Sequence, residues 1–239
     1  MIKKIIKQII NIFDKGGNYK RFTFSQYGED INIQLLLRDL YRVSKVNYMD
    51  IGCCHPYENN NTYLFYKSGS AGVNIDANPR FIQNFNKLRP RDVNINAGVV
   101  PPLQSSNLYF FEMSLSDMST FDQDVVASNE KAGINVVAKY EVPVYTLEQI
   151  VQKYFAGKDI HFMSIDVEGV DFGIIESYDF EKNTRPYIIC IENVKFGWKK
   201  YEEIKNSKLT EMFASKGYYL ISKTLMNDIY VDARRPHFF

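Results

Sequence analysis

The sequence lacks most features that assign a chain to a specialised class. Its 239 residues contain three cysteines, two of them adjacent, and carry a net charge of +1. Adjacent cysteines rarely form a bridge and an odd number leaves one over, so we expect reduced thiols and a cytoplasmic location. The near-neutral charge does not indicate a nucleic-acid partner, and we expect none. With 45% hydrophobic residues, a chain of this length predicts one globular domain that needs no disulfides.

Long apolar runs are absent as well. Residues 1–13 place isoleucines on one helical face and three lysines opposite, which predicts an amphipathic helix. This helix is too short to span a bilayer, and no signal-peptide cleavage site follows it. Two glycines then form a linker, so we assign residues 1–17 to helix and linker and residues 18–239 to the main domain. We expect the isoleucine face to pack on the domain, in a homodimer, or as a peripheral contact on an anionic membrane.

What the chain does contain is an alternation of short apolar runs and helical segments. Such runs are typical of strands buried in a parallel sheet, and two runs near the C-terminus flank a short turn, as in a hairpin. The pattern predicts an α/β three-layer sandwich with a mostly parallel sheet, a C-terminal antiparallel hairpin and an N-terminal helical extension. The predicted parallel strands are 46–51, 72–76, 91–97, 160–166 and 187–192, and the hairpin strands are 218–222 and 228–231.

One long segment interrupts this alternation. Residues 114–140 are polar, rich in serine, aspartate and asparagine, and without a clear helical or strand period. A stretch of this length in a compact domain is typically a lid or a substrate-binding loop. We therefore predict an irregular loop there, between short strands at 108–112 and 142–145.

Two strand ends carry the pattern of a cofactor site. Asp50-Ile51-Gly52 ends one predicted strand, and Gly52 allows the backbone to turn sharply beside a ligand. Asp76 ends the next strand, 24 residues after Gly52, where an acid can accept both ribose hydroxyls of a nucleotide-like cofactor. Each feature alone is more often a helix cap or a turn residue, but the pair at this spacing favours a cofactor.

The phosphate-binding fingerprint G-x-G-x-x-G is missing, because Cys54 and Pro56 stand where its other glycines would be. A cofactor without phosphates is therefore favoured, and S-adenosylmethionine, with its adenine, ribose and zwitterionic amino acid, fits. Cys53-Cys54 lacks C-x-x-C spacing, so we assign this pair to packing rather than to redox chemistry.

A second group of polar residues ends two other strands. Asp166 ends one of them, with Glu168 close behind, and Glu192-Asn193 ends the other. Hard oxygen ligands from adjacent strand ends can hold Mg²⁺ or Mn²⁺, which would lower the pKa of a sugar hydroxyl. Asp166, Glu192 and Asn193 are therefore our candidate metal ligands. The alternative is that Glu168 caps a helix and that Glu192 pairs with a lysine.

Three residues are candidates for the catalytic proton transfer. His55 is the histidine nearest to the predicted cofactor turn, and an imidazole, with its unperturbed pKa of about 6.5, suits a general base. A lone histidine is nevertheless more often structural. Asp166 and Glu168 are the alternative catalytic residues, acting directly on the acceptor through a carboxylate.

Five motifs between Phe24 and Asp171 are part of one family similarity, which extends from about Phe24 to Val231. They are Phe24-Ser25-Gln26-Tyr27-Gly28-Glu29-Asp30, Asp50-Ile51-Gly52 with His55-Pro56, Asn61-Thr62 before Phe65-Tyr66, Arg89-Pro90-Arg91-Asp92, and Ser164-Ile165-Asp166-Val167-Glu168-Gly169-Val170-Asp171. With these motifs the chain resembles the FkbM-type methyltransferase family. The resemblance implies a class I, Rossmann-like S-adenosylmethionine-dependent fold and O-methylation, frequently of sugars in glycan or natural-product pathways.

The resemblance also implies a set of cofactor contacts. Asp50, Gly52 and Asp76 would touch S-adenosylmethionine, and Ser25 and Gln26 would close over it. Most relatives have Ala-Asn or Ala-His where this chain has Cys53-Cys54. The full set of candidate cofactor-binding residues is Ser25, Gln26, Asp50, Gly52, Cys53, Asp76, Ala77 and Asp92.

We therefore predict an O-methyltransferase that acts on a sugar hydroxyl of a surface glycan or of its nucleotide-linked precursor. One alternative is a nucleotide-sugar oxidoreductase, against which the missing glycine fingerprint stands. Another is a non-catalytic cofactor-fold scaffold in a glycan-assembly complex, against which the intact Asp50, Asp76 and Asp166 stand. In the first two cases the partner is a small-molecule or glycan substrate.

Overall fold

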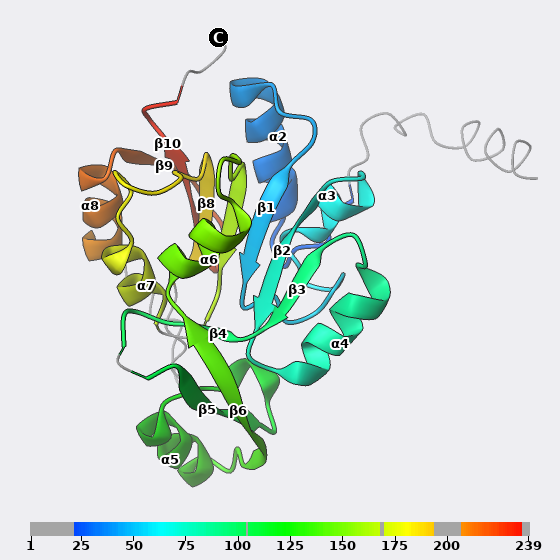
Figure 1. Cartoon of the computed structure of the whole chain (residues 1–239), viewed down its shortest axis with the longest axis vertical. Helices are drawn as coiled ribbons and strands as arrows, with labels where there is room; N and C mark the ends of the chain where they lie inside the picture. Colours follow the sequence, from blue (N-terminus) through cyan, green and yellow to red (C-terminus); the bar gives the residue numbers. More distant parts are fainter. Residues whose placement is uncertain (1–21, 104, 168–169, 194–206, 236–239) are drawn as a thin grey trace, which may run out of the picture.

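The computed structural model describes residues 22–103, 105–167, 170–193 and 207–235. Their main feature is a seven-stranded sheet in the order β3-β2-β1-β7-β8-β10-β9 (Figure 1). The first five strands in that order are parallel, and the last two form an antiparallel hairpin at one edge. The strands are β1 Asn47–Ile51, β2 Ala71–Asp76, β3 Val93–Asn96, β7 Phe162–Ile165, β8 Ile188–Glu192, β9 Tyr218–Lys223 and β10 Asn227–Asp232.

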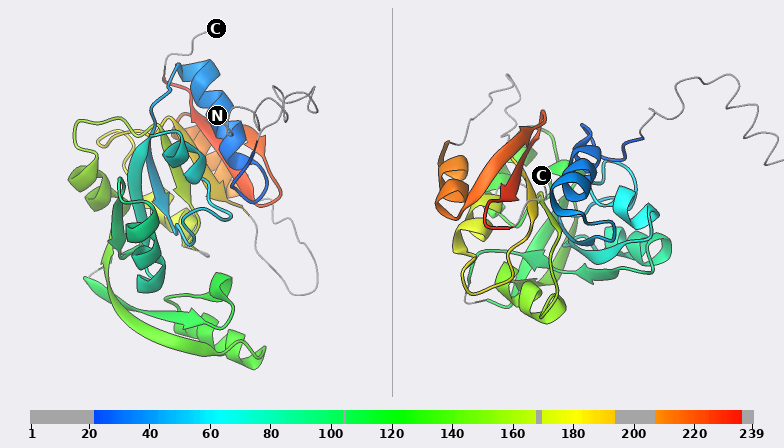
Figure 2. Two further views of the ribbon diagram at one scale, coloured as in Figure 1. Left: turned by 90° about the vertical axis from the view of Figure 1, so that its right-hand side faces the viewer. Right: turned by 90° about the horizontal axis from the view of Figure 1, so that it is seen from above.

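Helices cover both faces of this sheet (Figure 2). Successive strand residues point to opposite faces, so Tyr48 packs with the first helices of the chain while Met49 packs with the later ones. The predicted three-layer α/β sandwich is confirmed. One face carries α2 Glu29–Tyr41, α3 Tyr63–Lys67 and α4 Pro79–Leu88, and the other carries α6 Leu147–Tyr154, α7 Asp171–Ser177 and α8 Ser207–Ser215.

The prediction of an irregular loop at 114–140 is wrong. Strand β5 (Asn107–Met113) pairs antiparallel with a ten-residue strand β6 (Val136–Tyr145), and β4 (Gly98–Val99) joins the far end of β6. Between them lie the 3₁₀ turn η1 (Ser116–Met118) and helix α5 (Gln123–Lys131). We call residues 107–145 the arm, and it lies beyond the carboxyl ends of β1 and β2 (Figure 1).

The arm has local signals that the polar composition obscured. From Val136 onward, more buried and exposed residues alternate along β6, which is the period of a strand with one covered face. Asp122 caps α5 because its carboxylate accepts the backbone N–H of Asp124 at 2.8 Å. The segment is therefore an ordered extension of the domain.

The predicted amphipathic helix in residues 1–17 lies outside the described residues, so the helix and the domain division after residue 17 stay predictions. Helix α2 begins at Glu29 after Gly28, which is its N-cap residue and has a φ of +84°. Within the described part of the chain, no helix has the length and apolarity to cross a membrane.

Candidate active site

Gly52 marks the point where the two halves of the sheet meet at their carboxyl ends. Its φ of +76° favours glycine, and a Cβ built on it would lie 1.7 Å from the carbonyl oxygen of Asp166. The Gly52 N–H donates to the carbonyl of Ile75 at 2.9 Å, and the Asp166 N–H donates to the carbonyl of Ile51 at 2.9 Å. The carboxyl ends of β1, β2 and β7, which we call their exits, are therefore in contact. Ligands bind at this edge in open α/β sheets, and we call the edge the rim.

Asp76 lies beside this turn at the end of β2. Its Oδ1 accepts the Asn78 N–H at 2.7 Å and its Oδ2 accepts the Cys54 N–H at 2.9 Å. Burial raises the pKa of Asp76 to about 6, although both of these hydrogen bonds act to lower it. Each carboxylate oxygen keeps a second lone pair, as an acceptor of two ribose hydroxyls requires.

Asp50 is buried on the α2–α4 face of β1. Its Oδ2 accepts from Asn60 Nδ2 at 3.0 Å and from Thr62 Oγ1 at 2.8 Å. Burial raises the pKa of Asp50 from its ordinary value, against the effect of the nearby Arg89 guanidinium. Arg89 reaches the same two neighbours, donating to Asn60 Oδ1 at 3.1 Å and to Thr62 Oγ1 at 3.0 Å.

Asp92 has a different place from the one predicted. It precedes β3 and therefore lies at the amino end of that strand, away from Gly52 and Asp76. Its carboxylate accepts from Tyr48 Oη at 2.7 Å, Arg89 Nε at 2.8 Å, and the Gly72 N–H and Asn74 Nδ2 at 2.9 Å each. This position favours a structural role over contact with a cofactor.

The sequence did not reveal that Arg89 is fully buried. Its guanidinium lies 5.0 Å from the ring centroid of Phe85 and 5.1 Å from that of Tyr66. The sequence shows the motif that contains Arg89 and Asp92, but its role as an internal scaffold depends on Tyr48 and Asn60, which are distant in sequence.

The loop before α2 crosses the same rim, although its two predicted cofactor residues differ. The Ser25 hydroxyl is buried and donates to Asp30 Oδ1 at 2.9 Å, whereas Gln26 is exposed. The carbonyl of Phe24 accepts the Asn60 N–H at 2.9 Å. This hydrogen bond holds the loop beside Asp50, Asn60 and Thr62, which we call the Asp50 cluster. Ser25 therefore orders the loop, and Gln26 is placed to face solvent or a ligand.

Glu29 ties the start of α2 to the C-terminal hairpin. Its Oε1 accepts from Thr224 Oγ1 at 2.6 Å and from Asn227 Nδ2 at 3.1 Å, and its Oε2 accepts the Tyr27 N–H at 2.9 Å. Burial acts to raise the pKa of Glu29, but these hydrogen bonds outweigh it and lower the pKa. The loop 22–28 is thus held between the Asp50 cluster and the turn of β9 and β10.

Two further candidate cofactor-binding residues near Gly52, Cys53 and Ala77, are both buried. Cys53 is buried and packs with Ile82 and Phe85 of α4, as expected of a packing residue. Ala77 is buried against Phe110 of the arm. Neither is placed on an open surface.

His55 Nδ1 accepts the backbone N–H of Glu58 at 3.0 Å. A neutral His55 in this geometry carries its proton on Nε2 and so presents a donor, not a free lone pair. This arrangement disfavours His55 as the general base.

The exits of β7 and β8 form the other half of the rim. Asp166 is exposed and Glu192 is half-buried, and the register Ile165 with Ile191 places them on adjacent strands. Asn193 Nδ2 donates to Asp228 Oδ2 at 2.6 Å. Glu168 lies outside the described residues. Among the residues that are described, no group of three or more His, Cys, Asp or Glu side chains is arranged to hold a metal ion.

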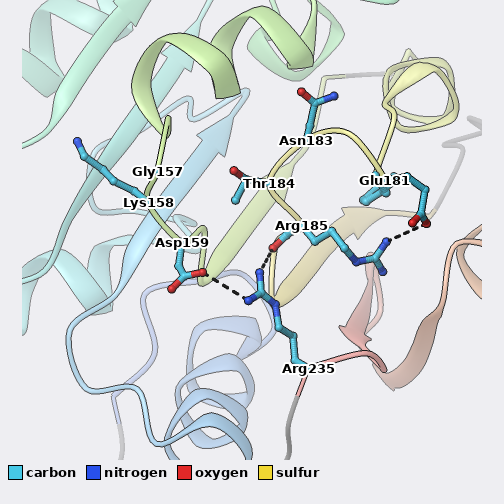
Figure 3. Close-up of a pocket in the computed structure, with 9 residues that line it drawn as sticks. Gly157, Lys158, Asp159, Glu181, Asn183, Thr184, Arg185 and Arg235 are labelled. Carbon is cyan, nitrogen blue, oxygen red and sulfur yellow. Dashed lines mark hydrogen bonds and ion pairs between the residues drawn. The ribbon is translucent and has the colours of Figure 1, made fainter.

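A hollow of about 440 Å³ lies at the opposite, amino end of the sheet (Figure 3). Its arginines already have partners: Arg185 donates to both carboxylate oxygens of Asp232, at 2.8 and 3.0 Å, and Arg235 pairs with Asp159 at 3.5 Å. Asp159 precedes β7 and Arg185 precedes β8, so this hollow is separate from the candidate active site.

Comparison with known proteins identifies the family. Residues 50–218 match the family model described as the Methyltransferase FkbM domain. The chain belongs to the FkbM methyltransferase family. It is an S-adenosylmethionine-dependent methyltransferase, and this favours the methyltransferase prediction over the oxidoreductase alternative. No curated protein matches the chain.

Solved structures similar to this FkbM protein are also methyltransferases by description. One is a TehB-like S-adenosylmethionine-dependent methyltransferase from Corynebacterium glutamicum ATCC 13032 Kitasato, 10% identical, with TM-score 0.41 and 96% and 97% of the two chains covered. A putative rRNA methylase from Clostridium thermocellum is 10% identical, with TM-score 0.42 and coverage of 88% and 97%. An O-methyltransferase from Bacillus cereus in complex with SAH is 14% identical, with TM-score 0.40 and coverage of 93% and 88%.

The described residues fit the cofactor of the FkbM family. The absence of a side chain at Gly52 lets the Asp166 carbonyl approach the end of β1, and the buried carboxylate of Asp76 stands beside this turn with lone pairs for a ribose diol. Asp50 is held rigidly one strand away from Asp76 by Asn60 and Thr62. Asp76 and Gly52 would therefore hold the ribose and the amino-acid end, with Asp50 supporting the turn between them.

Proposed function

We propose that the protein is an O-methyltransferase that acts on a sugar hydroxyl of a surface glycan or of its nucleotide-linked precursor. The observation that carries this proposal is the position of Asp166. It is exposed at the end of β7, and its backbone lies against Gly52. Glu192 ends the adjacent strand, so two carboxylates lie at the rim beside Gly52, where in this proposal the methyl group is delivered. Carboxylates accept hydrogen bonds from hydroxyls, and a sugar offers several hydroxyls at once.

Bound S-adenosylmethionine supplies an electrophilic methyl carbon. The residues of this chain need to align the acceptor oxygen within about 3–3.5 Å of that carbon and to remove its proton. Asp166 would accept that proton at its carboxylate, since His55 presents a donor in the described geometry. Asp76 and Gly52 would fix the donor side, so that alignment depends on the short distance between the exits of β1 and β7.

The test is a transfer assay with methyl-labelled S-adenosylmethionine and a panel of nucleotide sugars and glycans. We expect label on a hydroxyl oxygen, with the rate about 10²- to 10⁴-fold lower in Asp166→Asn. Asp159→Asn removes a carboxylate at the amino end of the sheet and serves as the matched control with an unchanged rate. Label found on an amine or a thiol, and on no hydroxyl in the panel, would refute O-methylation.

A metal-assisted version of this reaction stays a separate proposal. It is supported by the adjacent strand ends that carry Asp166, Glu192 and Asn193. In that case chelation abolishes turnover, and Mg²⁺ or Mn²⁺ restores it. Full activity in the presence of chelator would rule it out.

We also propose a cytoplasmic enzyme whose residues 1–17 form an accessory helix. The isoleucine face of this segment supports packing on the domain or in a homodimer, with an anionic membrane as the alternative surface. Deletion of residues 1–15 should leave cofactor affinity unchanged. Flotation with anionic liposomes that is lost on this deletion would identify the membrane as the binding surface, and equal flotation would exclude it.

A further inference from the structure

The order of the strands predicts where the nucleobase of the cofactor lies. Gly52 ends β1 and Asp76 ends β2, and β3 is the next strand along the sheet. The base and the sulfur-bearing carbon are attached to the two ring carbons on either side of the ribose ring oxygen, so they extend away from each other. A ligand with its sulfur near Gly52 and its ribose on Asp76 therefore extends its base toward the end of β3, where Asn96 is followed by Ala97 and Gly98.

This end of β3 is closely joined to the end of β2. Asn96 Nδ2 donates to the carbonyls of Asp76 at 3.0 Å and Ala77 at 2.9 Å. The Ala97 N–H donates to the carbonyl of Asp76 at 3.0 Å. Asp76, Ala77 and Gly98 thus belong to one continuous stretch of backbone surface.

The arm places an aromatic ring on that surface. A Cβ built on Gly98 would lie 2.5 Å from Cζ of Phe121, so the ring is in contact with the Gly98 backbone. Phe121 also packs with the apolar cluster around Ala77, with its ring centroid 5.3 Å from that of Phe110. It is only partly buried, so the ring has an edge or face left for a ligand.

A polar cluster around the buried Glu112 fixes the arm in this position. Glu112 on β5 accepts from Asn78 Nδ2 at 2.9 Å, from Tyr140 Oη at 3.0 Å and from Arg80 Nη2. Burial acts to raise the pKa of Glu112, but these hydrogen bonds outweigh it and lower the pKa. Asn78 in turn donates its backbone N–H to Asp76, so the ribose carboxylate and the arm share one neighbour.

We propose that the arm closes the nucleobase end of the cofactor site and that Phe121 packs against the adenine. Every nucleobase offers a π-face to an aromatic ring, and alanine substitution of such a ring measurably weakens binding. The proposal concerns the cofactor alone and does not depend on the acceptor. A failure here leaves sugar O-methylation standing, and the reverse also holds.

The test compares two ligands that differ only in the base. S-adenosylhomocysteine carries adenine, and S-ribosylhomocysteine is the same molecule without it. Calorimetric titration of the full chain should show Phe121→Ala weakening the first ligand about 5- to 150-fold, the range of base–aromatic stacking. Affinity for the second ligand should stay within about twofold, since it has no base to lose.

Tyr109→Ala is the matched control, because Tyr109 is an aromatic residue of the same arm that is 48% exposed. It should leave both affinities unchanged. Phe121→Leu keeps an apolar side chain in the cluster if alanine disturbs the fold, and it should still weaken S-adenosylhomocysteine binding about fivefold. The proposal is overturned if both Phe121 variants bind this ligand as wild type does, or if they weaken both ligands equally.

Discussion

Asp50 and Asp166 stand at the exits of two neighbouring parallel strands, yet their surroundings are opposite. Asp50 is buried and accepts hydrogen bonds from Asn60 and Thr62, which Arg89 holds in place. Asp166 is exposed, and its close neighbour is the backbone of Gly52. The acid of the β1 exit is therefore held in a fixed position, whereas the acid of the β7 exit is exposed. On this difference rests our proposal that the β1–β3 half of the rim is the cofactor half and the β7–β8 half the acceptor half.

The difference teaches that similar strand endings can serve different tasks. The segments Asp50-Ile51-Gly52 and Ile165-Asp166-Val167 both have the sequence pattern of a strand that ends near an acid. What separates them is the partner that reaches each acid from a distant part of the chain. On the proposed cofactor half, Asn60 and Thr62 reach Asp50 directly, and the buried Arg89, which is paired with Asp92, holds both of them.

The largest effect is expected from Arg89→Met. Removal of the guanidinium leaves the carboxylate of Asp92 buried without its cation, which costs about 3–5 kcal/mol of unfolding free energy. Denaturant unfolding measures this loss. Arg91→Met is the matched control, because Arg91 is exposed over Tyr66 and its removal should cost less than about 1 kcal/mol. An equal loss of unfolding free energy in the two variants would mean that the buried Arg89–Asp92 pair does not stabilise the β1–β3 half of the rim.

Gly52→Ala should come next and should act mainly on the cofactor. The added Cβ must displace the Asp166 carbonyl, so the exits of β1 and β7 move apart. We expect at least about 100-fold weaker binding of S-adenosylhomocysteine, equivalent to about 2.8 kcal/mol. Gly133→Ala is the control: Gly133 also has positive φ, +85°, but nothing lies within 4 Å of its Cβ position. If both variants bind normally, close approach at Gly52 is not required.

The effect of pH on Asp76 should be smaller. In our proposal the ionised carboxylate accepts the ribose hydroxyls, and burial raises the pKa of Asp76 to about 6. Binding of S-adenosylhomocysteine should therefore weaken about tenfold per pH unit below 6 and level off above it. Because this pKa is raised above its unfolded value, the protonated form stabilises the fold, and that stability is lost as pH rises from about 4 to about 6. A binding profile with the same inflection in Asp76→Ala would assign it to another group.

The sequence predicts the sheet and its exits because β1, β2, β7 and β8 are short, mostly apolar runs that end at or next to an acid or a glycine. It did not predict which acids are open to ligands. Asp92 follows Arg89 closely in the chain, but its binding partners Tyr48 and Asn74 come from other strands. The arm is hard to predict for a different reason: the alternation from Val136 to Tyr145 follows a long polar segment whose composition is typical of a loop.

The contrast between the two halves is tested most directly by titrating S-adenosylhomocysteine into Asp76→Ala and Asp166→Asn. We expect affinity to fall about 10- to 100-fold in the first variant, because a hydrogen bond to a charged group contributes about 1.5–3 kcal/mol. In the second it should stay within about twofold of wild type, because Asp166 serves the acceptor. An equal loss in both variants, or no loss in Asp76→Ala, would contradict the division of the rim into a cofactor half and an acceptor half.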